Sequence, residues 1–83
     1  MTRQILSIEQ PEIGQLVRDL RQLLGLTQEK FAAKLGVAFP TINRWENNKA
    51  TPSPMALRLI EAEAGKLGEP GHKLLERYFS RYS

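Results

Sequence analysis

Several side chains that form hydrogen bonds fall within one short stretch in the middle of the 83-residue chain. They are Thr41, Asn43, Arg44, Asn47 and Asn48. Hydroxyl, amide and guanidinium groups of this kind contact the phosphates and the base edges of DNA. A surface that only meets water more often carries glutamate and lysine. The stretch therefore favours a nucleic-acid contact, and Lys49, which follows it, is a candidate phosphate ligand.

Other chemistries find little support among the remaining residues. His72 is the sole histidine and cysteine is absent, so a metal site or a catalytic triad lacks its partners. Gly65, Gly68 and Gly71 are not preceded by a strand and lack the G-K-[ST] order of a phosphate-binding loop, which favours turns at these positions. We therefore expect no enzymatic activity, no metal and no cofactor.

Composition and charge are those of a small globular domain. The net charge is +3 and the pI is about 9.6, values that are compatible with a polyanionic partner without demonstrating one. The absence of cysteine favours a reducing cytoplasm. No apolar run approaches the roughly 18 residues of a membrane span. We expect a cytoplasmic, nucleoid-associated protein that has no membrane partner.

Apolar periodicity predicts an all-α chain. Apolar residues recur at spacings of three and four from Ile13 to Leu24, and no segment shows the alternation of a strand. Pro11 and Pro54 suit the first turns of helices. The expected division is an N-terminal arm at residues 1–9 and one domain at 10–83, with helices at about 11–24, 28–35, 39–47, 54–64 and 72–80.

The second and third of these helices carry the polar stretch. Thr27 is a predicted N-cap, Gly36 allows a sharp reversal, and Val37 fills the angle between the two helices. The third helix is about 13 Å long at 1.5 Å per residue, which fits across the major groove of DNA. Residues 27–48 are therefore predicted to form a helix-turn-helix motif. Trp45 could stack on a base, but its place on the apolar side of the third helix favours the core.

The same region resembles the lambda-repressor/Cro type of helix-turn-helix domain, the XRE-like family, over about residues 12–64. The resemblance rests on elements that occur in order at the family spacing, namely L-T-Q at 26–28, A-x-x-L-G-V at 32–37 and W-E-N at 45–47. It implies a five-helix, lambda-repressor-like bundle in which the third helix is the recognition helix. It also implies an ion pair between Arg21 and Glu46 that links the first helix to the end of the third.

The resemblance further implies a role for each residue of the motif. Gln28 would contact a phosphate or a neighbouring base. The positions that face base edges are Phe39, Pro40, Thr41 and Arg44, and those that lie along the DNA backbone are Asn43, Asn47 and Lys49. Asn47 and Asn48 also end the helix, because asparagine accepts left-handed geometry, and phosphate contact is an added role for this pair.

Two features depart from the family pattern. Ala38 stands where serine or threonine often caps the recognition helix, so one capping hydrogen bond is lost at a cost of roughly 1 kcal/mol. Phe39 and Pro40 replace polar residues, and phenylalanine offers only apolar contact, for instance with a thymine methyl. Direct readout would then depend on Arg44 and Thr41, with fewer specified base pairs or some reliance on DNA shape.

These observations lead to one leading hypothesis and two alternatives. The leading hypothesis is sequence-specific binding to double-stranded DNA by a transcriptional regulator of prokaryotic or phage type, as a homodimer on a near-palindromic site. The first alternative is an antitoxin that autoregulates through the same DNA-binding domain and whose arm or C-terminal helix also neutralises a toxin. The second is a protein-interaction module that has kept the fold and lost DNA binding.

Overall fold

The computed structural model of the chain describes residues 12–78 and contains five helices and no strand within that range. The helices are α1 (Glu12–Leu24), α2 (Gln28–Leu35), α3 (Phe39–Glu46), α4 (Pro54–Gly65) and α5 (Glu69–Tyr78). The all-α, five-helix prediction is confirmed. The expected arm at residues 1–9, Pro11 and the part of the last helix beyond residue 78 lie outside the described residues.

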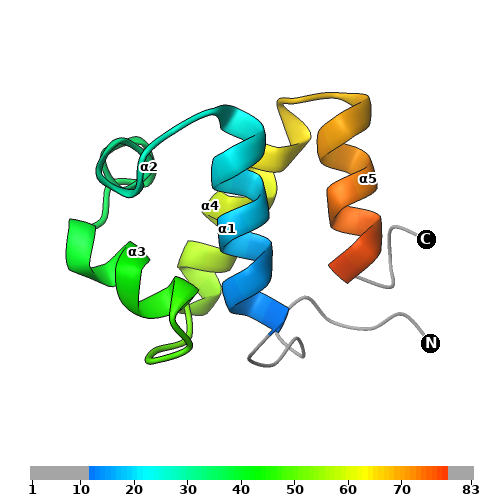
Figure 1. Cartoon of the computed structure of the whole chain (residues 1–83). Coiled ribbons are helices and arrows are strands. Elements are labelled where there is room, and N and C mark those ends of the chain that lie inside the picture. Colours follow the sequence, from blue (N-terminus) through cyan, green and yellow to red (C-terminus); the bar gives the residue numbers. More distant parts are fainter. Residues whose placement is uncertain (1–11, 79–83) are drawn as a thin grey trace.

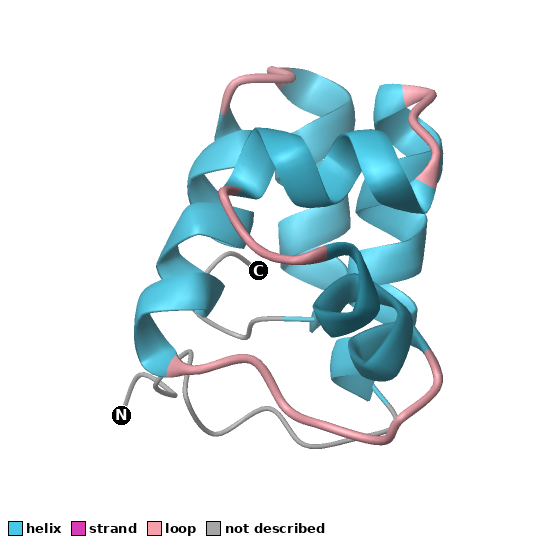
Figure 2. Cartoon of the chain, turned by 90° about the vertical axis from the view of Figure 1, so that its left-hand side faces the viewer, coloured by secondary structure: helices cyan, strands magenta, loops and turns pink. Residues whose placement is uncertain are grey.

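Helix α1 lies at the centre of the molecule. Helix α3 packs on one side of it with α2 beside α3, α5 packs on the other side, and α4 lies behind (Figure 1). In the view onto the side formed by α2 and α3, α2 runs across the molecule and α3 lies below it (Figure 2). The central helix therefore separates the helix-turn-helix from α5.

Apolar side chains from all five helices form one core. Its largest fully buried members are Phe31, Ile13, Leu16, Leu20, Ile42, Ile60 and Val17. Trp45 is only 4% exposed, which confirms its place in the core. Leu23, expected on the buried stripe of α1, is instead 44% exposed, because at its position α1 borders a groove and not a packed neighbour.

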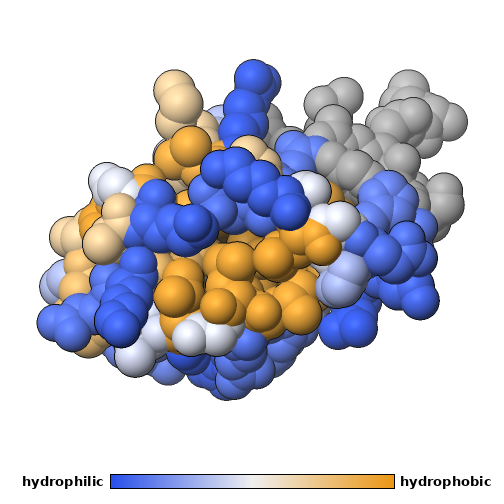
Figure 3. All heavy atoms as spheres, turned by 90° about the horizontal axis from the view of Figure 1, so that it is seen from above, coloured by the Kyte–Doolittle hydropathy of each residue, from blue (hydrophilic) through white to orange (hydrophobic). Residues whose placement is uncertain are grey.

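The core is not covered evenly by polar side chains. Leu24, Leu26 and Leu67 pack against it while remaining partly exposed. In Figure 3, apolar side chains gather in the middle of the face seen from above, and hydrophilic ones occupy much of its margin. Most of the domain nevertheless follows the amphipathic pattern expected of helices around a single core.

The connection between α4 and α5 is shorter than the sequence predicts. Helix α5 begins at Glu69 and not at His72, with Pro70 in its first turn, where the missing N–H of proline has no intrahelical partner in any case. Gly68 has a left-handed φ of 69° and ends the turn. Gly71, expected in a turn, is buried within α5 against the backbone carbonyl of Ala64, which leaves no room for a Cβ.

Candidate nucleic-acid interface

Short-range hydrogen bonds close α2 at both of its ends. The Thr27 hydroxyl accepts a bond from the backbone N–H of Lys30 at 3.1 Å and caps α2. Gly36 adopts the left-handed region with a φ of 77°, and Val37 N–H then donates to the carbonyl of Ala32 at 2.9 Å. The bonds at Gly36 and Val37 end α2 and form the turn that leads into α3.

A buried carboxylate fixes α3 on α1. Glu46, the last residue of α3, has a side chain that is only 1% exposed, and it accepts bonds from Arg21 Nε at 2.7 Å and Arg21 Nη2 at 3.2 Å. Arg21 Nη1 also donates to the carbonyl of Leu26 at 3.0 Å, and Arg18 Nε lies 3.5 Å from Glu46 Oε1. The structure therefore contains the expected Arg21–Glu46 pair and adds Arg18 to it.

The carboxylate of Glu46 is held in its charged form. Burial alone pushes the pKa of Glu46 upward, because it disfavours a charge. The hydrogen bonds from Arg21 and Gln28, together with the charges of Arg21 and Arg18, outweigh burial and lower the pKa below its ordinary value. The same hydrogen bond raises the pKa of Arg21. The pair is therefore ionised at neutral pH.

A row of three amides runs outward from this carboxylate. Gln28 Nε2 donates to Glu46 Oε1 at 3.0 Å, Asn43 Nδ2 donates to Gln28 Oε1 at 3.1 Å, and Asn47 Nδ2 donates to Asn43 Oδ1 at 3.2 Å. A carboxylate only accepts, so Gln28 must turn its amide nitrogen inward, and each following amide takes the same direction. The row thus joins the first turn of α2 to the end of α3 in one orientation.

The remaining candidate residues lie on the surface of α3 and the loop after it. Phe39, Pro40, Arg44 and Lys49 are exposed, and Thr41 is partly buried. Lys49 N–H donates to the carbonyl of Arg44 at 2.8 Å, which holds the loop under the end of the helix. Asn48 adopts a left-handed φ of 60°, the geometry expected where the helix terminates.

The exposed charges on the surface of α3 and its following loop are positive. From Gly36 to Thr51 the chain carries a single acidic residue, Glu46, and that residue is buried. Arg44 and Lys49 are exposed in the same segment. The face of α3 therefore presents cations, amides and apolar groups to solvent and no carboxylate, which suits contact with a polyanion.

Two contributions to this site were not predicted. Gly14 packs so closely on the end of α3 that an added Cβ would lie 2.7 Å from the Trp45 carbonyl oxygen and would also meet Asn48 Oδ1. Arg18 Nη2 donates to the backbone carbonyl of Glu46 at 3.4 Å. The spacing of Gly14, Arg18 and Arg21 places them along one side of α1, which was the available signal.

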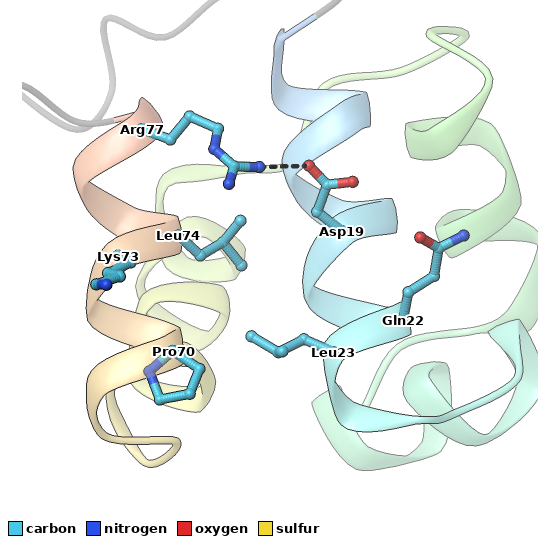
Figure 4. A pocket seen from close by; sticks show the side chains of 7 residues that line it. All are labelled: Asp19, Gln22, Leu23, Pro70, Lys73, Leu74 and Arg77. Carbon is cyan, nitrogen blue, oxygen red and sulfur yellow. Dashed lines mark ion pairs between the residues drawn. The ribbon is translucent and has the colours of Figure 1, made fainter.

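A separate groove of about 480 Å³ lies between α1 and α5, on the other side of α1 from the helix-turn-helix. Figure 4 shows Leu23 and Leu74 within it and Arg77 reaching across to Asp19, 3.6 Å away. Asp19 Oδ2 also accepts a 2.8 Å hydrogen bond from the Tyr78 hydroxyl. Burial, followed by this contact with Asp19, raises the pKa of Tyr78 to about 12. These contacts fasten α5 to α1.

A bundle of five helices with a capped α2, a tight glycine turn and an exposed α3 free of surface carboxylates is a helix-turn-helix domain of the kind found in DNA-binding regulators. The chain belongs to the XRE-type helix-turn-helix family, whose model, described as helix-turn-helix, matches residues 17–66. The resemblance seen in the sequence is confirmed.

A curated relative supports the regulatory class. A protein of Cereibacter sphaeroides named "Propionyl-CoA carboxylase regulator" is 40% identical over 52 residues, a match that covers 63% of this chain and 11% of the relative. The chain thus spans about a tenth of that protein's length. No solved structure matches the chain significantly. Among the described residues, no helix is long and apolar enough to cross a membrane.

Proposed function

We propose that this chain binds double-stranded DNA in a sequence-specific manner, with α3 in the major groove, as the DNA-reading part of a transcriptional regulator. The observation that carries the proposal is the surface of α3 and its following loop, on which the sole acid, Glu46, is buried while Arg44 and Lys49 are exposed. An exposed helix of this composition favours phosphates and base edges over an ordinary protein partner.

Within this proposal the two kinds of side chain have different roles. The base-reading positions are Phe39, Pro40, Thr41 and Arg44. The positions assigned to backbone phosphates are Gln28, Asn43, Asn47, Asn48 and Lys49. The amide row supports the assignment of Gln28, Asn43 and Asn47 to phosphates. Each of these amides uses one N–H within the row and keeps a second N–H, which a phosphate oxygen can accept.

We extend the proposal to the oligomeric state and the cellular location of the protein. A helix-turn-helix of this size reads few base pairs, so a homodimer on two half-sites about one helical turn apart supplies the specificity. We place the protein in the cytoplasm, on the nucleoid, with no catalytic step of its own. The antitoxin hypothesis differs in adding a toxin as a protein partner, and a toxin gene beside this one would favour it.

The direct test is a titration of the chain against random and selected duplexes at several salt concentrations. Affinity should fall linearly in a plot of log affinity against log salt, because phosphate contacts release counterions. Selected duplexes should bind more tightly than random ones at every salt concentration. Absence of binding at low salt would refute DNA binding, and equal affinity for all duplexes would refute sequence specificity.

Two substitutions distinguish base recognition from binding of the phosphate backbone. Arg44→Ala should relax the base preference and cost about 1–3 kcal/mol on the selected duplex, whereas Lys49→Ala should weaken all duplexes alike and reduce the salt slope by about one. Arg58→Ala removes an exposed arginine from α4 and serves as the matched control for loss of charge. An unchanged base preference in Arg44→Ala would contradict its assignment.

A further inference from the structure

The first turn of α3 is apolar and lies on the surface. Ala38, Phe39 and Pro40 are all exposed, and Phe39 is 45% exposed, whereas Phe31 is fully buried and Trp45 is 4% exposed. Nearly half of the surface of Phe39 therefore stays in water in the free protein, beside two further exposed apolar residues. A molecule that covers the cluster would remove this remaining apolar area from water.

The same turn is poor in hydrogen-bond donors. A helix N-terminus ordinarily offers backbone N–H groups to an anion. Here Ala38 provides no side-chain cap, Pro40 has no N–H, and the N–H of Thr41 is used by the carbonyl of Ala38 at 3.0 Å. This end of α3 is consequently better suited to an apolar group than to a phosphate.

The surroundings of the cluster select the kind of molecule that covers it. Arg44 is exposed on the same helix and Lys49 on the loop after it, and the only acid of the segment is buried. A surface with this charge complements a polyanion. In the major groove of DNA the apolar group on the base edges is the C5-methyl of thymine, and 5-methylcytosine carries a methyl at the same ring position.

We propose that Phe39, supported by Pro40, is a contact for the 5-methyl group of a pyrimidine, so that the chain distinguishes thymine from uracil and methylated from unmethylated cytosine. The inference rests on the proposed function, since it requires α3 in the major groove. It makes binding sensitive to cytosine methylation of the site, a modification that leaves base pairing unchanged.

The test uses a duplex selected for tight binding, in which each thymine is replaced in turn by deoxyuridine and each cytosine by 5-methylcytosine. At the position covered by Phe39, loss of one buried methyl should weaken binding by about fourfold. In a second duplex that carries a cytosine at that position, methylation of this cytosine should strengthen binding by about the same factor. In Phe39→Ala both ratios should fall to about one, whereas Met55→Ala, which truncates a residue of α4 that is 71% exposed, should keep them.

Each outcome decides between the hypotheses. If replacing thymine by uracil weakens binding of the wild-type protein at none of the positions, the inference is overturned while DNA binding itself stands. A uracil effect that persists in Phe39→Ala, or that disappears in Met55→Ala, also overturns it, because the methyl contact then lies elsewhere. Absence of binding to any duplex at low salt refutes the proposed function, and the inference falls with it.

Discussion

Replacement of Arg21 by methionine tests whether the buried carboxylate of Glu46 governs the stability of the domain. Methionine keeps much of the aliphatic length of arginine and removes the guanidinium. Glu46 would lose bonds of 2.7 and 3.2 Å, and the carbonyl of Leu26 would lose one of 3.0 Å. Only Gln28 at 3.0 Å and Arg18 at 3.5 Å would remain beside the carboxylate.

The expected cost follows from the burial of Glu46. Removing one partner of a buried ion pair typically destabilises a protein by about 3–5 kcal/mol, and the remaining Arg18 places this case at the lower end, about 3 kcal/mol. For a domain of this size that corresponds to a fall in Tm of roughly 10–25 °C. Arg77→Met is the matched control: Arg77 is 65% exposed and 3.6 Å from Asp19, so its loss should cost under about 1 kcal/mol.

The pH dependence gives a second, independent readout. In the wild-type protein the pKa of Glu46 is lower in the folded than in the unfolded state, so its contribution is present above the unfolded value and is lost as the pH falls through the folded one. Without Arg21, burial is opposed only by Gln28 and Arg18, so we expect the pKa of Glu46 to rise and the variant to be most destabilised at neutral pH. The deficit should shrink as the pH falls and the carboxyl takes up a proton.

Urea denaturation followed by far-ultraviolet circular dichroism, at neutral pH and at progressively lower pH, measures both effects as free energies of unfolding. A deficit below about 1 kcal/mol at neutral pH would refute the assigned importance of the pair. A deficit that stays constant or grows as the pH is lowered would refute the argument that a buried, uncompensated charge causes it.

Three further substitutions probe other contacts. Gly14→Ala would put a Cβ 2.7 Å from a backbone oxygen of α3 and should cost about 1–3 kcal/mol by urea denaturation, whereas Gly65→Ala, whose Cβ meets nothing within 4 Å, should cost nothing. Tyr78→Phe should cost about 1 kcal/mol, and it should remove the loss of stability that the wild-type protein shows as pH rises from about 10, the ordinary tyrosine pKa, through about 12. Gln28→Met breaks the amide row and should weaken binding to every duplex about three- to tenfold without changing the salt slope, unlike Gln22→Met on α1. The proposed contact of Gly14 would be contradicted if Gly65→Ala lost as much stability as Gly14→Ala. The role of the amide row would be contradicted if Gln22→Met weakened DNA binding as much as Gln28→Met.

The sequence was sufficient for elements that local chemistry determines. The cap at Thr27, the reversal at Gly36, the left-handed Asn48 and the uncapped start of α3 at Ala38 all follow from the conformational preferences of single residues. The burial of Trp45 follows from its spacing on an amphipathic helix. These features need no knowledge of which helices pack together.

Features that depend on packing between helices were missed. Pro70 and Gly71 look like helix breakers in the sequence, but the proline occupies a first turn and the glycine accommodates the carbonyl of Ala64. Leu23 fits the apolar period of α1, yet no helix covers it. The amide row was equally hidden, because Gln28 and Glu46 are 18 residues apart and their bond requires the docking of α2 against α3.

Under the proposed function, recognition and folding depend on different residues of α3. Phe39, Pro40 and Arg44 are exposed, whereas Ile42 and Glu46 on the same eight-residue helix are buried. Substitutions at exposed positions usually change stability by no more than about 0.5 kcal/mol. If α3 reads DNA as proposed, a duplicated gene can acquire a new operator through changes at these three surface positions while its scaffold stays intact, so that such domains diverge in target faster than in fold.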